Sequence, residues 1–369
     1  MTQPQVFITG GGGYLGSRLA RKYLDETNLD VHLWLHAQDE LDFHAKRDWL
    51  IPLFQHVHAR VTYSWGDLAS PDPFASIVPH HIEHVIHSAA VTRFNVDAET
   101  ARSVNIEGTR KLLRFADRCS SLQAIGLLST VYASGLQAGL VEEVALSGHV
   151  GFANYYEHSK WAAETILLTD FPHLPWRILR TGTVIADDTD GTVTQYNAFH
   201  NTLKLLYYGL LSLLPGHAQT PLYFVTGTFV AQAIVDLMVL GSNQAIYHVA
   251  HTKEESLSLE SLISCVFSTF ESHPDFSRRR VLKPLFTDHE SFLLLESGVS
   301  QFSGQVINQA ISSISPFAKQ LFVDKTIQNH RLKALLPTYQ APDPQELVRQ
   351  ICNYLVRTKW GREVVHASL

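Results

Sequence analysis

One short segment, NYYEHSKWAAE, carries a tyrosine and a lysine at a spacing that suits proton transfer. Tyr156 precedes Lys160 by four residues, and on a helix this spacing brings both side chains onto one face. A lysine ammonium beside a phenol stabilises the phenolate and lowers the pKa of the tyrosine, which prepares it to exchange a proton near neutral pH. Tyr155 competes for this role, but only Tyr156 has a lysine four residues further on. The segment therefore predicts a catalytic tyrosine, Tyr156, with Lys160 beside it.

Two hydroxyl residues, Ser129 and Thr130, end the apolar run of AIGLLST, about 26 residues before Tyr156. A hydroxyl at the carboxyl end of a strand can donate a hydrogen bond to a substrate oxygen alongside the tyrosine. The Y-x-x-x-K pattern is a weak signal by itself, and its weight comes from the order of the motifs along the chain. We take Ser129 and Thr130 as alternative catalytic hydroxyls.

A glycine cluster comes first in that order, in the segment VFITGGGGYLGSRLARKYL. Gly10, Gly13 and Gly16 fit the spacing G-x-x-G-x-x-G between an apolar run and a helical pattern. Glycine removes the Cβ that would block an anion, and the helix N-terminus offers free N–H groups to a pyrophosphate. The segment predicts a dinucleotide-binding turn.

Other positions that follow expected strands fit the same cofactor. Small residues after the fourth strand let a cofactor lie across the strand ends, and Asp67 can accept a hydrogen bond from an adenine amino group. Thr183 follows the sixth strand where a nicotinamide carboxamide is expected, and Asn105 can hold backbone near the site. The expected cofactor-binding residues are Gly10, Gly13, Tyr14, Leu15, Gly16, His36, Asp67, Leu68, Ser88, Ala89, Ala90, Asn105, Lys160 and Thr183.

The end of the second expected strand, VHLWLHAQDE, bears on which nicotinamide cofactor is used. NAD-specific sites usually place an acidic residue there to hold the ribose 2′-hydroxyl. His36 stands at that place, Asp39 comes late, and HAKR supplies Lys46 and Arg47 further on. The missing acid favours NADP(H) over NAD(H).

Alternating strand and helix patterns position these residues. Such alternation predicts an α/β fold, a Rossmann-type doubly wound parallel sheet. The expected strands are Gln5–Thr9, Val31–Leu35, Val61–Trp65, His84–Ser88, Ala124–Ser129, Trp176–Arg180 and Ala245–Val249. The expected helices are Tyr14–Glu26, Ala98–Ser120, Tyr155–Asp170, Gln195–Leu206 and Phe229–Leu240.

The rhythm changes after about Ala250, where amphipathic helical patterns follow one another without intervening strands. We expect a Rossmann domain over 1–250, with insertions of the substrate lobe around 190–225, and a mostly helical C-terminal substrate lobe over 251–369. Such a lobe would lie over the carboxyl edge of the sheet, where these folds bind a second ligand.

The composition limits the class of protein. With 369 residues, 45% hydrophobic and 17% charged, the chain is globular with either a rather apolar surface or a large cavity. A net charge of −6 argues against nucleic acid as a partner. Three scattered cysteines suggest neither a disulfide framework nor a zinc site, which fits a reducing cytoplasm. No signal peptide, transmembrane segment or metal site is expected, although His80, His81, His84 and His87 are close in sequence.

With these motifs in hand, the chain resembles the extended short-chain dehydrogenase/reductases, most closely the thioester reductase and fatty acyl-CoA reductase (male-sterility-like) branch. The resemblance rests on TGGGGYLGSRL, HSAAVTRFNVDAETARSVNIEGTRKLL, LLSTVYASG, NYYEHSKWAAETILL and RTGTVIADDTDGTVTQYNAFHNTLKLL, in that order. It covers roughly Val6 to Leu240. Three departures concern cofactor and substrate: the branch usually has arginine near His36, proline at Thr181 and an acid at Gly227.

The resemblance implies a mechanism. Hydride passes from the nicotinamide to a carbonyl carbon, Tyr156 gives a proton to its oxygen, and Thr130 (or Ser129) hydrogen-bonds that oxygen. Lys160 tunes Tyr156 and grips the nicotinamide ribose. The implied substrate is an apolar small molecule, an acyl thioester or a ketone or aldehyde. The apolar stretches LKLLYYGLLSLL and SFLLLESGV are candidates to line its site, although core packing explains each of them as well.

Two other classes stay open. A nucleotide-sugar epimerase or dehydratase shares this scaffold and needs cations to bind a diphosphate. The segment SRRRVLK (Ser277–Lys283) could provide those cations. A non-catalytic dinucleotide-binding protein is disfavoured by the intact Tyr156 and Lys160. Because helices next to the Tyr/Lys face often pair subunits in this superfamily, a homodimer is a further expectation.

Overall fold

A parallel sheet of seven strands forms the centre of the molecule. The computed structural model describes residues 3–302 and 314–363. The sheet has the order β12-β7-β5-β4-β1-β2-β3, and every neighbouring pair is parallel. Its strands are β1 (Gln5–Thr9), β2 (Asp30–His36), β3 (Val61–Gly66), β4 (Ile82–His87), β5 (Ala124–Thr130), β7 (Trp176–Thr181) and β12 (Ala245–Val249). The chain reverses its winding direction between β1 and β4, so the expected doubly wound sheet is confirmed.

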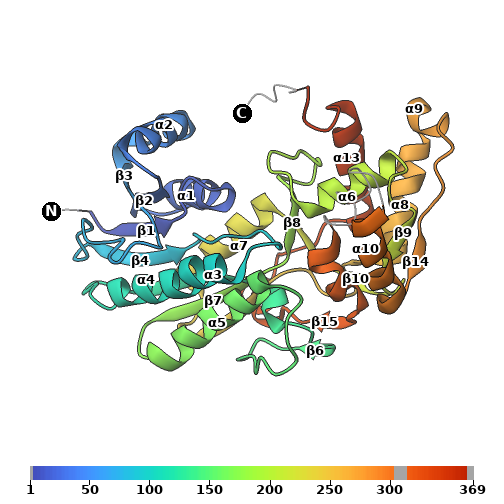
Figure 1. Cartoon of the computed structure of the whole chain (residues 1–369). Helices are drawn as coiled ribbons and strands as arrows, with labels where there is room; N and C mark the ends of the chain where they lie inside the picture. The colour runs from blue at the N-terminus through green and yellow to red at the C-terminus, as the bar shows by residue number, and fades with distance from the viewer. Residues whose placement is uncertain (1–2, 303–313, 364–369) are drawn as a thin grey trace.

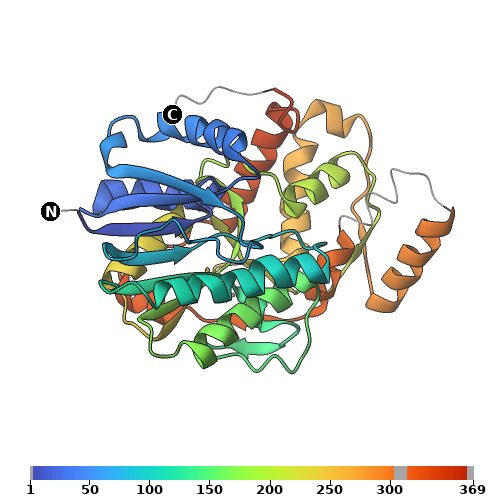
Figure 2. The same ribbon diagram turned by 60° about the vertical axis from the view of Figure 1, so that its left-hand side comes forward.

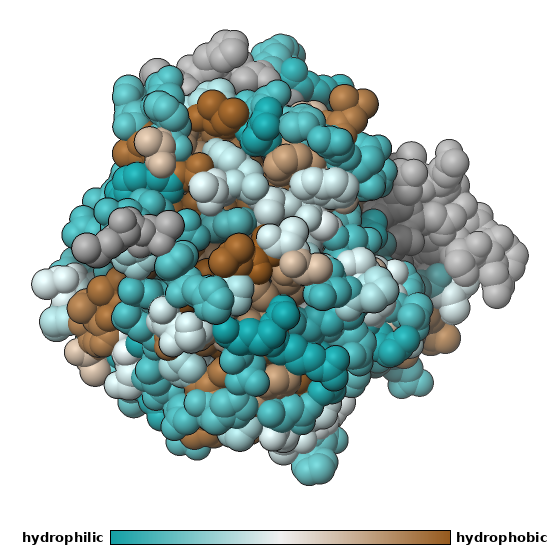
Figure 3. Space-filling model, turned by 90° about the vertical axis from the view of Figure 1, so that its left-hand side faces the viewer, coloured by the Kyte–Doolittle hydropathy of each residue, from teal (hydrophilic) through white to brown (hydrophobic). Residues whose placement is uncertain are grey.

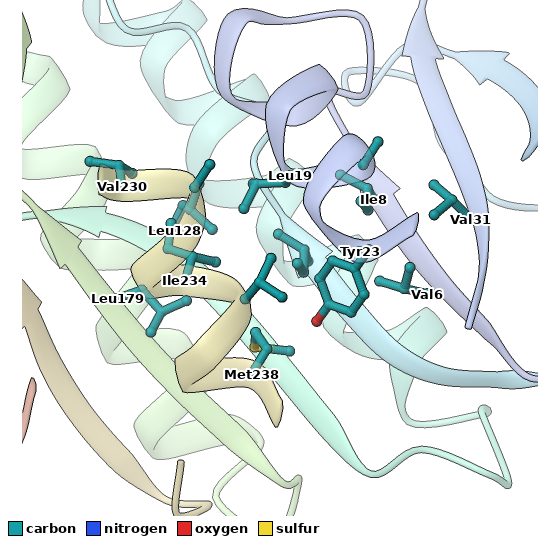
Figure 4. Close-up of a cluster of buried hydrophobic side chains, with 14 of the residues drawn as sticks. Val6, Ile8, Leu19, Tyr23, Val31, Leu128, Leu179, Val230, Ile234 and Met238 are labelled. Atoms are coloured by element: carbon teal, nitrogen blue, oxygen red, sulfur yellow. The ribbon is translucent and has the colours of Figure 1, made fainter. Parts of the chain in front are cut away.

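Helices cover both faces of this sheet (Figures 1 and 2). One face carries α1 (Tyr14–Glu26), α2 (Glu40–Leu50) and α7 (Gly227–Leu240), and the other carries α4 (Gly108–Ala116) and α5 (Tyr155–Asp170). Figure 4 shows the first of these layers, in which side chains of α1 and α7 meet over the strands. The labelled side chains there are Leu19, Tyr23, Val230, Ile234 and Met238 from the two helices and Val6, Ile8, Val31, Leu128 and Leu179 from strands.

The expected elements agree with the observed ones over most of the sheet. Each of the seven strands begins and ends within two residues of its expected bounds, and α1 and α5 coincide with theirs. The helix expected over Ala98–Ser120 is instead three consecutive pieces: α3 (Ala98–Thr100), a π-helical stretch over Ala101–Glu107, and α4.

A second core lies beside the sheet, on the right in Figure 1. Its helices are α6 (Ala198–Tyr207), α8 (Leu259–Glu271), α9 (Pro274–Ser277), α10 (His289–Phe302) and α13 (Pro344–Arg357). Residues 303–313, part of the C-terminal region expected to be helical, lie outside the described residues. The second core draws on 185–222 as well as 257–360. Conversely, Leu332 of α12 (His330–Leu335) packs into the first core.

The expectation that no strands interrupt the C-terminal part is wrong. Among its described residues there are three short strands, and each pairs with a strand from earlier in the chain. The pairs are β13 (Leu257–Ser258) with β10 (Pro221–Leu222), β14 (Leu285–Thr287) with β9 (Leu213–Pro215), and β15 (Lys325–Ile327) with β6 (Gly139–Val141). A fourth pair joins β8 (Thr183–Ala186) to β11 (Phe224–Thr226). Strands of two or three residues are too short to show an alternating pattern in the sequence.

Short 3-10 turns complete the framework, at Ile51–Phe54, His58–Arg60, Val131–Ser134 and Lys319–Phe322. None of the helices in the described parts of the chain combines the length and apolar character that a bilayer span requires. On the face seen in Figure 3, hydrophobic residues form small separate groups among hydrophilic ones. A continuous apolar surface on the face seen in Figure 3 therefore does not account for the 45% hydrophobic residues of the chain.

Candidate active site

A cavity of about 1220 Å³ lies between the carboxyl edge of the sheet and the second core. It exceeds the roughly 300–1,000 Å³ of common ligand pockets, so it has room for a dinucleotide and a second ligand. The expected site residues that line it are Gly10, Gly13, Tyr14, Leu15, His36, Asp67, Leu68, Ser88, Ala89, Ala90, Thr130, Tyr156 and Thr183. Four others, Gly16, Asn105, Ser129 and Lys160, are not among its lining residues.

The glycine turn between β1 and α1 forms one wall. Gly10 has a φ of +71°, and a Cβ there would come within 2.8 Å of the Ala89 backbone nitrogen. Gly16 supports the turn from behind, because a Cβ there would overlap the Gly10 carbonyl oxygen. Helix α1 starts without a side-chain cap on Gly13 and without an acidic residue in its first turn. Its N-terminus therefore faces the cavity as a site that fits an anion such as a pyrophosphate.

Tyr14 ties this turn to the segment after β8. Its hydroxyl donates to Asp187 Oδ1 at 2.7 Å, and Arg18 Nη2 lies 2.8 Å from the same carboxylate. A Cβ at residue 227 would overlap the Tyr14 hydroxyl, so Gly227 makes room for this contact. Gly227 stands where the family usually has an acidic residue, and in this structure another acidic residue, Asp187, lines the cavity.

At the end of β2, His36 is exposed and lines the cavity together with Lys46. Lys46 Nζ donates to the His36 carbonyl oxygen at 2.8 Å and lies 2.7 Å from Asp42 Oδ2. The Asp39 side chain instead caps α2, where it accepts from the Asp42 N–H. Of the charged residues that line the cavity, Lys46 is the one nearest to β2 in the sequence. The first charged group after the end of β2 that faces the cavity is therefore a cation.

Asn105 acts behind the wall. Its amide pairs with both backbone groups of Val91, at 2.8 and 2.9 Å, and donates to Ser159 Oγ at 2.9 Å. The π-helical stretch turns this side chain inward, where it is only 2% exposed. Asn105 thus holds the segment after β4, which lines the cavity, as the packing amide that the sequence suggested.

His87 extends this polar layer under the cavity. Thr109 Oγ1 donates to the Asn105 carbonyl at 2.6 Å, so it accepts from His87 Nε2 at 2.9 Å. The other ring nitrogen, Nδ1, then accepts from Thr9 Oγ1 at 2.8 Å. Burial lowers the pKa of His87 to about 3, with Lys160 adding to the effect, so the ring is neutral. His84 bonds to Tyr23 instead.

The two candidate hydroxyls point in different directions. Ser129 donates to Glu164 Oε1 at 2.5 Å, behind the wall. Thr130 lines the cavity, and its Oγ1 accepts only a 3.3 Å bond from the Tyr132 N–H among the described residues. Of the pair, Thr130 is the residue whose position allows contact with a ligand.

Tyr156 lines the cavity at the start of α5, and Lys160 follows one turn later, 7% exposed. The expected lowering of the tyrosine pKa is wrong for this structure. Burial raises the pKa of Tyr156, and the charge of Glu157 adds to the increase. Burial also lowers the pKa of Lys160 to about 8, against the opposing effect of Glu164. Desolvation is the largest cause of both shifts, because burial penalises the charged form of each group.

The far wall is apolar and aromatic. The Phe94 ring lies 5.8 Å from the Tyr156 ring and 5.9 Å from that of Phe317, and Pro316 and Phe199 also line the cavity. This wall was not predicted from the sequence. Phe94 follows a strand end and could have been found that way, whereas nothing in the sequence marks Pro316.

Neither of the two apolar stretches that were candidates to line the site contributes a described residue to the cavity lining. Leu203, Leu206 and Leu214 of LKLLYYGLLSLL, and Phe292 of SFLLLESGV, are buried in the second core. The cluster SRRRVLK also lies away from the cavity lining: Arg279 stacks on Tyr207 and Tyr208. Lys46 and Arg93 are the Lys or Arg residues that do line the cavity.

Comparison with known proteins fits this geometry. The model of the family described as Male sterility protein matches residues 8–234. The chain is 27% identical to an isonitrile lipopeptide synthase of Streptomyces coeruleorubidus over 55% of its length. It is 26% identical to the fatty acyl-CoA reductase wat of Drosophila melanogaster over 49% of its length. It spans only 15% and 43% of these relatives, respectively.

Solved structures share the fold. The terminal R domain from the myxalamid PKS-NRPS biosynthetic pathway matches with a TM-score of 0.78 at 19% identity, covering 98% of this chain and 92% of that one. UDP-glucuronic acid 4-epimerase from Bacillus cereus matches with a TM-score of 0.65 at 17% identity, covering 96% and 99%. At these identities the likeness shows the fold alone. By TM-score, the fold of this chain is more similar to the R domain than to the epimerase.

Proposed function

Because this chain belongs to the Male sterility protein family, we propose that it is an NAD(P)H-dependent reductase that transfers hydride to the carbonyl carbon of an apolar substrate. An acyl thioester is the favoured substrate, and a ketone or aldehyde is the second. The observation that carries the proposal is one cavity lined by the glycine turn, Thr130, Tyr156 and an aromatic wall. The similarity to a fatty acyl-CoA reductase favours the thioester.

In this proposal each residue has one task. A nicotinamide dinucleotide supplies the hydride when bound, and the α1 N-terminus receives its pyrophosphate. The hydroxyls of Thr130 and Tyr156 donate hydrogen bonds to the carbonyl oxygen, and Tyr156 gives it a proton. Burial keeps the Tyr156 phenol protonated and thus ready to donate. Lys160 is assigned the nicotinamide ribose from the resemblance to the family, since it is 7% exposed and is not among the residues that line the cavity.

NADP(H) is the favoured cofactor. Lys46 lines the cavity and contacts the end of β2 through the His36 carbonyl. The acidic residues that follow β2, Asp39, Glu40 and Asp42, are not among the lining residues. A 2′-phosphate needs a cation there, whereas a free 2′-hydroxyl needs an acid. Substituting Lys46→Ala should raise the KM for NADPH about tenfold and leave the KM for NADH nearly unchanged, as measured by steady-state kinetics.

The epimerase alternative is less well supported. A sugar diphosphate needs several cations, and the cluster considered for it does not line the cavity. Arg278 pairs with Asp275 at 3.1 Å, and Arg279 packs on aromatic rings. A cytoplasmic location, on the strength of three free buried cysteines, and a homodimer remain parts of the proposal.

The substrate is tested by following NADPH and NADH consumption with acyl-CoA thioesters, aldehydes and ketones. Consumption with a thioester, and formation of an aldehyde or an alcohol, would support the favoured substrate. Turnover with ketones or aldehydes alone would reassign it. If no carbonyl compound is reduced while a nucleotide sugar is converted, the reductase proposal fails.

A further inference from the structure

A buried carboxylate, Glu164, lies one helical turn beyond Lys160 and takes no direct part in the mechanism above. It is 2% exposed and accepts hydrogen bonds from one side chain on each of two strands, including a second, 3.2 Å bond from Arg180 Nε to Oε2. Ser129 Oγ of β5 donates to Oε1 at 2.5 Å. Arg180 of β7 donates from Nε to Oε1 at 3.0 Å and from Nη2 to Oε2 at 2.7 Å. Glu164 thus joins the catalytic helix to the carboxyl ends of two strands.

Arg180 is fully buried, and its remaining contacts are neutral. It donates to the Val144 carbonyl at 2.9 Å and lies 3.3 Å from His248 Nε2. The other nitrogen of that ring, Nδ1, lies 2.6 Å from the Gln328 carbonyl and must donate to it, so Nε2 is an acceptor. Burial and Arg180 lower the pKa of His248 to about 3. The cluster therefore holds one negative and one positive group.

Lys160 borders this cluster as a second buried cation. The titratable groups that act on it are Glu164 on its own helix and His87 on β4, which is neutral. Tyr156, also on its helix, is protonated. The Glu164 carboxylate is thus the group that favours the ammonium form of Lys160, against the cost of burial.

We propose that Glu164 is a positioning residue of this site: it holds the Ser129 hydroxyl by a hydrogen bond at the end of β5, and it places a buried carboxylate one helical turn from Lys160 on α5. Thr130 is then left as the hydroxyl that faces the ligand. The inference rests on the reductase function proposed above. It assigns a task to the final glutamate of NYYEHSKWAAE, which the sequence left without one.

The test is the variant Glu164→Gln, studied through the pH profile of NADPH-dependent reduction and of NADPH binding. We expect the alkaline limb of both profiles to move to lower pH by about one unit, because Lys160 loses a neighbouring charge. Glu143→Gln is the matched control. Glu143 is also buried, but it accepts from the backbone N–H groups of His248 and Arg331, and its substitution should not move the limb.

Glu164→Gln leaves the Arg180 charge unpaired and could fail to fold, so the double variant Glu164→Gln/Arg180→Met is measured with it. Circular dichroism establishes which variants fold. If a folded variant without the carboxylate keeps its alkaline limb at the wild-type pH, the inference is wrong. The binding profile needs no substrate, so it separates this failure from a failure of the proposed function, in which wild-type protein binds NADPH but reduces no carbonyl compound.

Discussion

At the scale of single residues, two adjacent hydroxyls have different surroundings. Ser129 and Thr130 follow one another at the end of β5, and alternation of side chains along a strand turns them to opposite sides. Ser129 meets the Glu164 carboxylate, whereas Thr130 lines the cavity with Tyr156. Their contributions to activity should differ accordingly.

Thr130→Val should lower kcat about a hundredfold, because it removes one donor to the developing negative charge on the carbonyl oxygen. Ser129→Ala should lower kcat much less and should instead reduce thermal stability, because a buried carboxylate loses a partner. Steady-state kinetics and thermal unfolding of both variants check this. Equal losses of kcat would show that the assignment of the two hydroxyls is wrong.

The pH dependence of the wild-type reaction follows from Lys160. Its pKa of about 8 means that the ammonium is present below this pH and lost above it. The Tyr156 phenol stays protonated over the same range because its pKa is raised. We expect kcat to fall as the pH rises through about 8, measured between about pH 6 and 10. A profile that is flat across pH 8 would contradict this.

The spacing of motifs was enough to predict where Tyr156, Thr130 and the glycine turn come together, because strand order and helix periodicity fix those positions. It could not predict the direction in which the Tyr156 pKa moves. That depends on burial by groups far from Tyr156 in the sequence, such as Phe94, whose ring packs on the Tyr156 ring and in turn on Phe317. The partner of Ser129 could not be predicted either, because Glu164 is 35 residues away in the sequence.

At the scale of elements, the π-helical stretch Ala101–Glu107 is the least regular part of the framework. Sequence periodicity predicted a single helix there, since one extra residue in a turn leaves little trace in the pattern. The irregular turn carries Asn105, whose amide satisfies both backbone groups of Val91. Asn105 therefore holds the wall of the cavity after β4 at Val91.

Replacing Asn105→Ala should lower the free energy of unfolding by about 2 kcal/mol, because two half-buried backbone groups of Val91 lose their partner. It should also lower kcat, since Phe94 and the rest of that wall are no longer held in place. Asn243→Ala is the control: this exposed amide makes a single 3.2 Å bond to the Gln123 carbonyl. Denaturant unfolding measures both. A loss no larger than the control's would contradict the role given to Asn105.

At the scale of the whole molecule, the two cores share elements across the sequence. The segment 185–222 packs in the second core, and Leu332, fully buried, packs in the first. Strand β6 also pairs with β15 from the C-terminal part. A division of the chain near residue 250 was the natural prediction from the change in rhythm, but the short strands that cross it are invisible to sequence patterns.

A truncated chain of residues 1–250 should therefore fail to fold cooperatively, because it exposes both the 185–222 segment and the surface that Leu332 covers. The full chain should unfold in a single transition. Calorimetry and limited proteolysis of the two proteins check this. A soluble 1–250 fragment with a sharp transition would show that the first core is independent.

The central claim is hydride transfer to a carbonyl carbon with Tyr156 as proton donor. The most direct measurement uses NADPH deuterated at the transferred position, an acyl-CoA substrate and mass spectrometry of the product, for wild type and Tyr156→Phe. The account predicts one deuterium in the product for each hydride transferred, and a rate at least a hundredfold lower in Tyr156→Phe with NADPH binding unchanged. A reduced product without deuterium, or an equal rate in Tyr156→Phe, would contradict it.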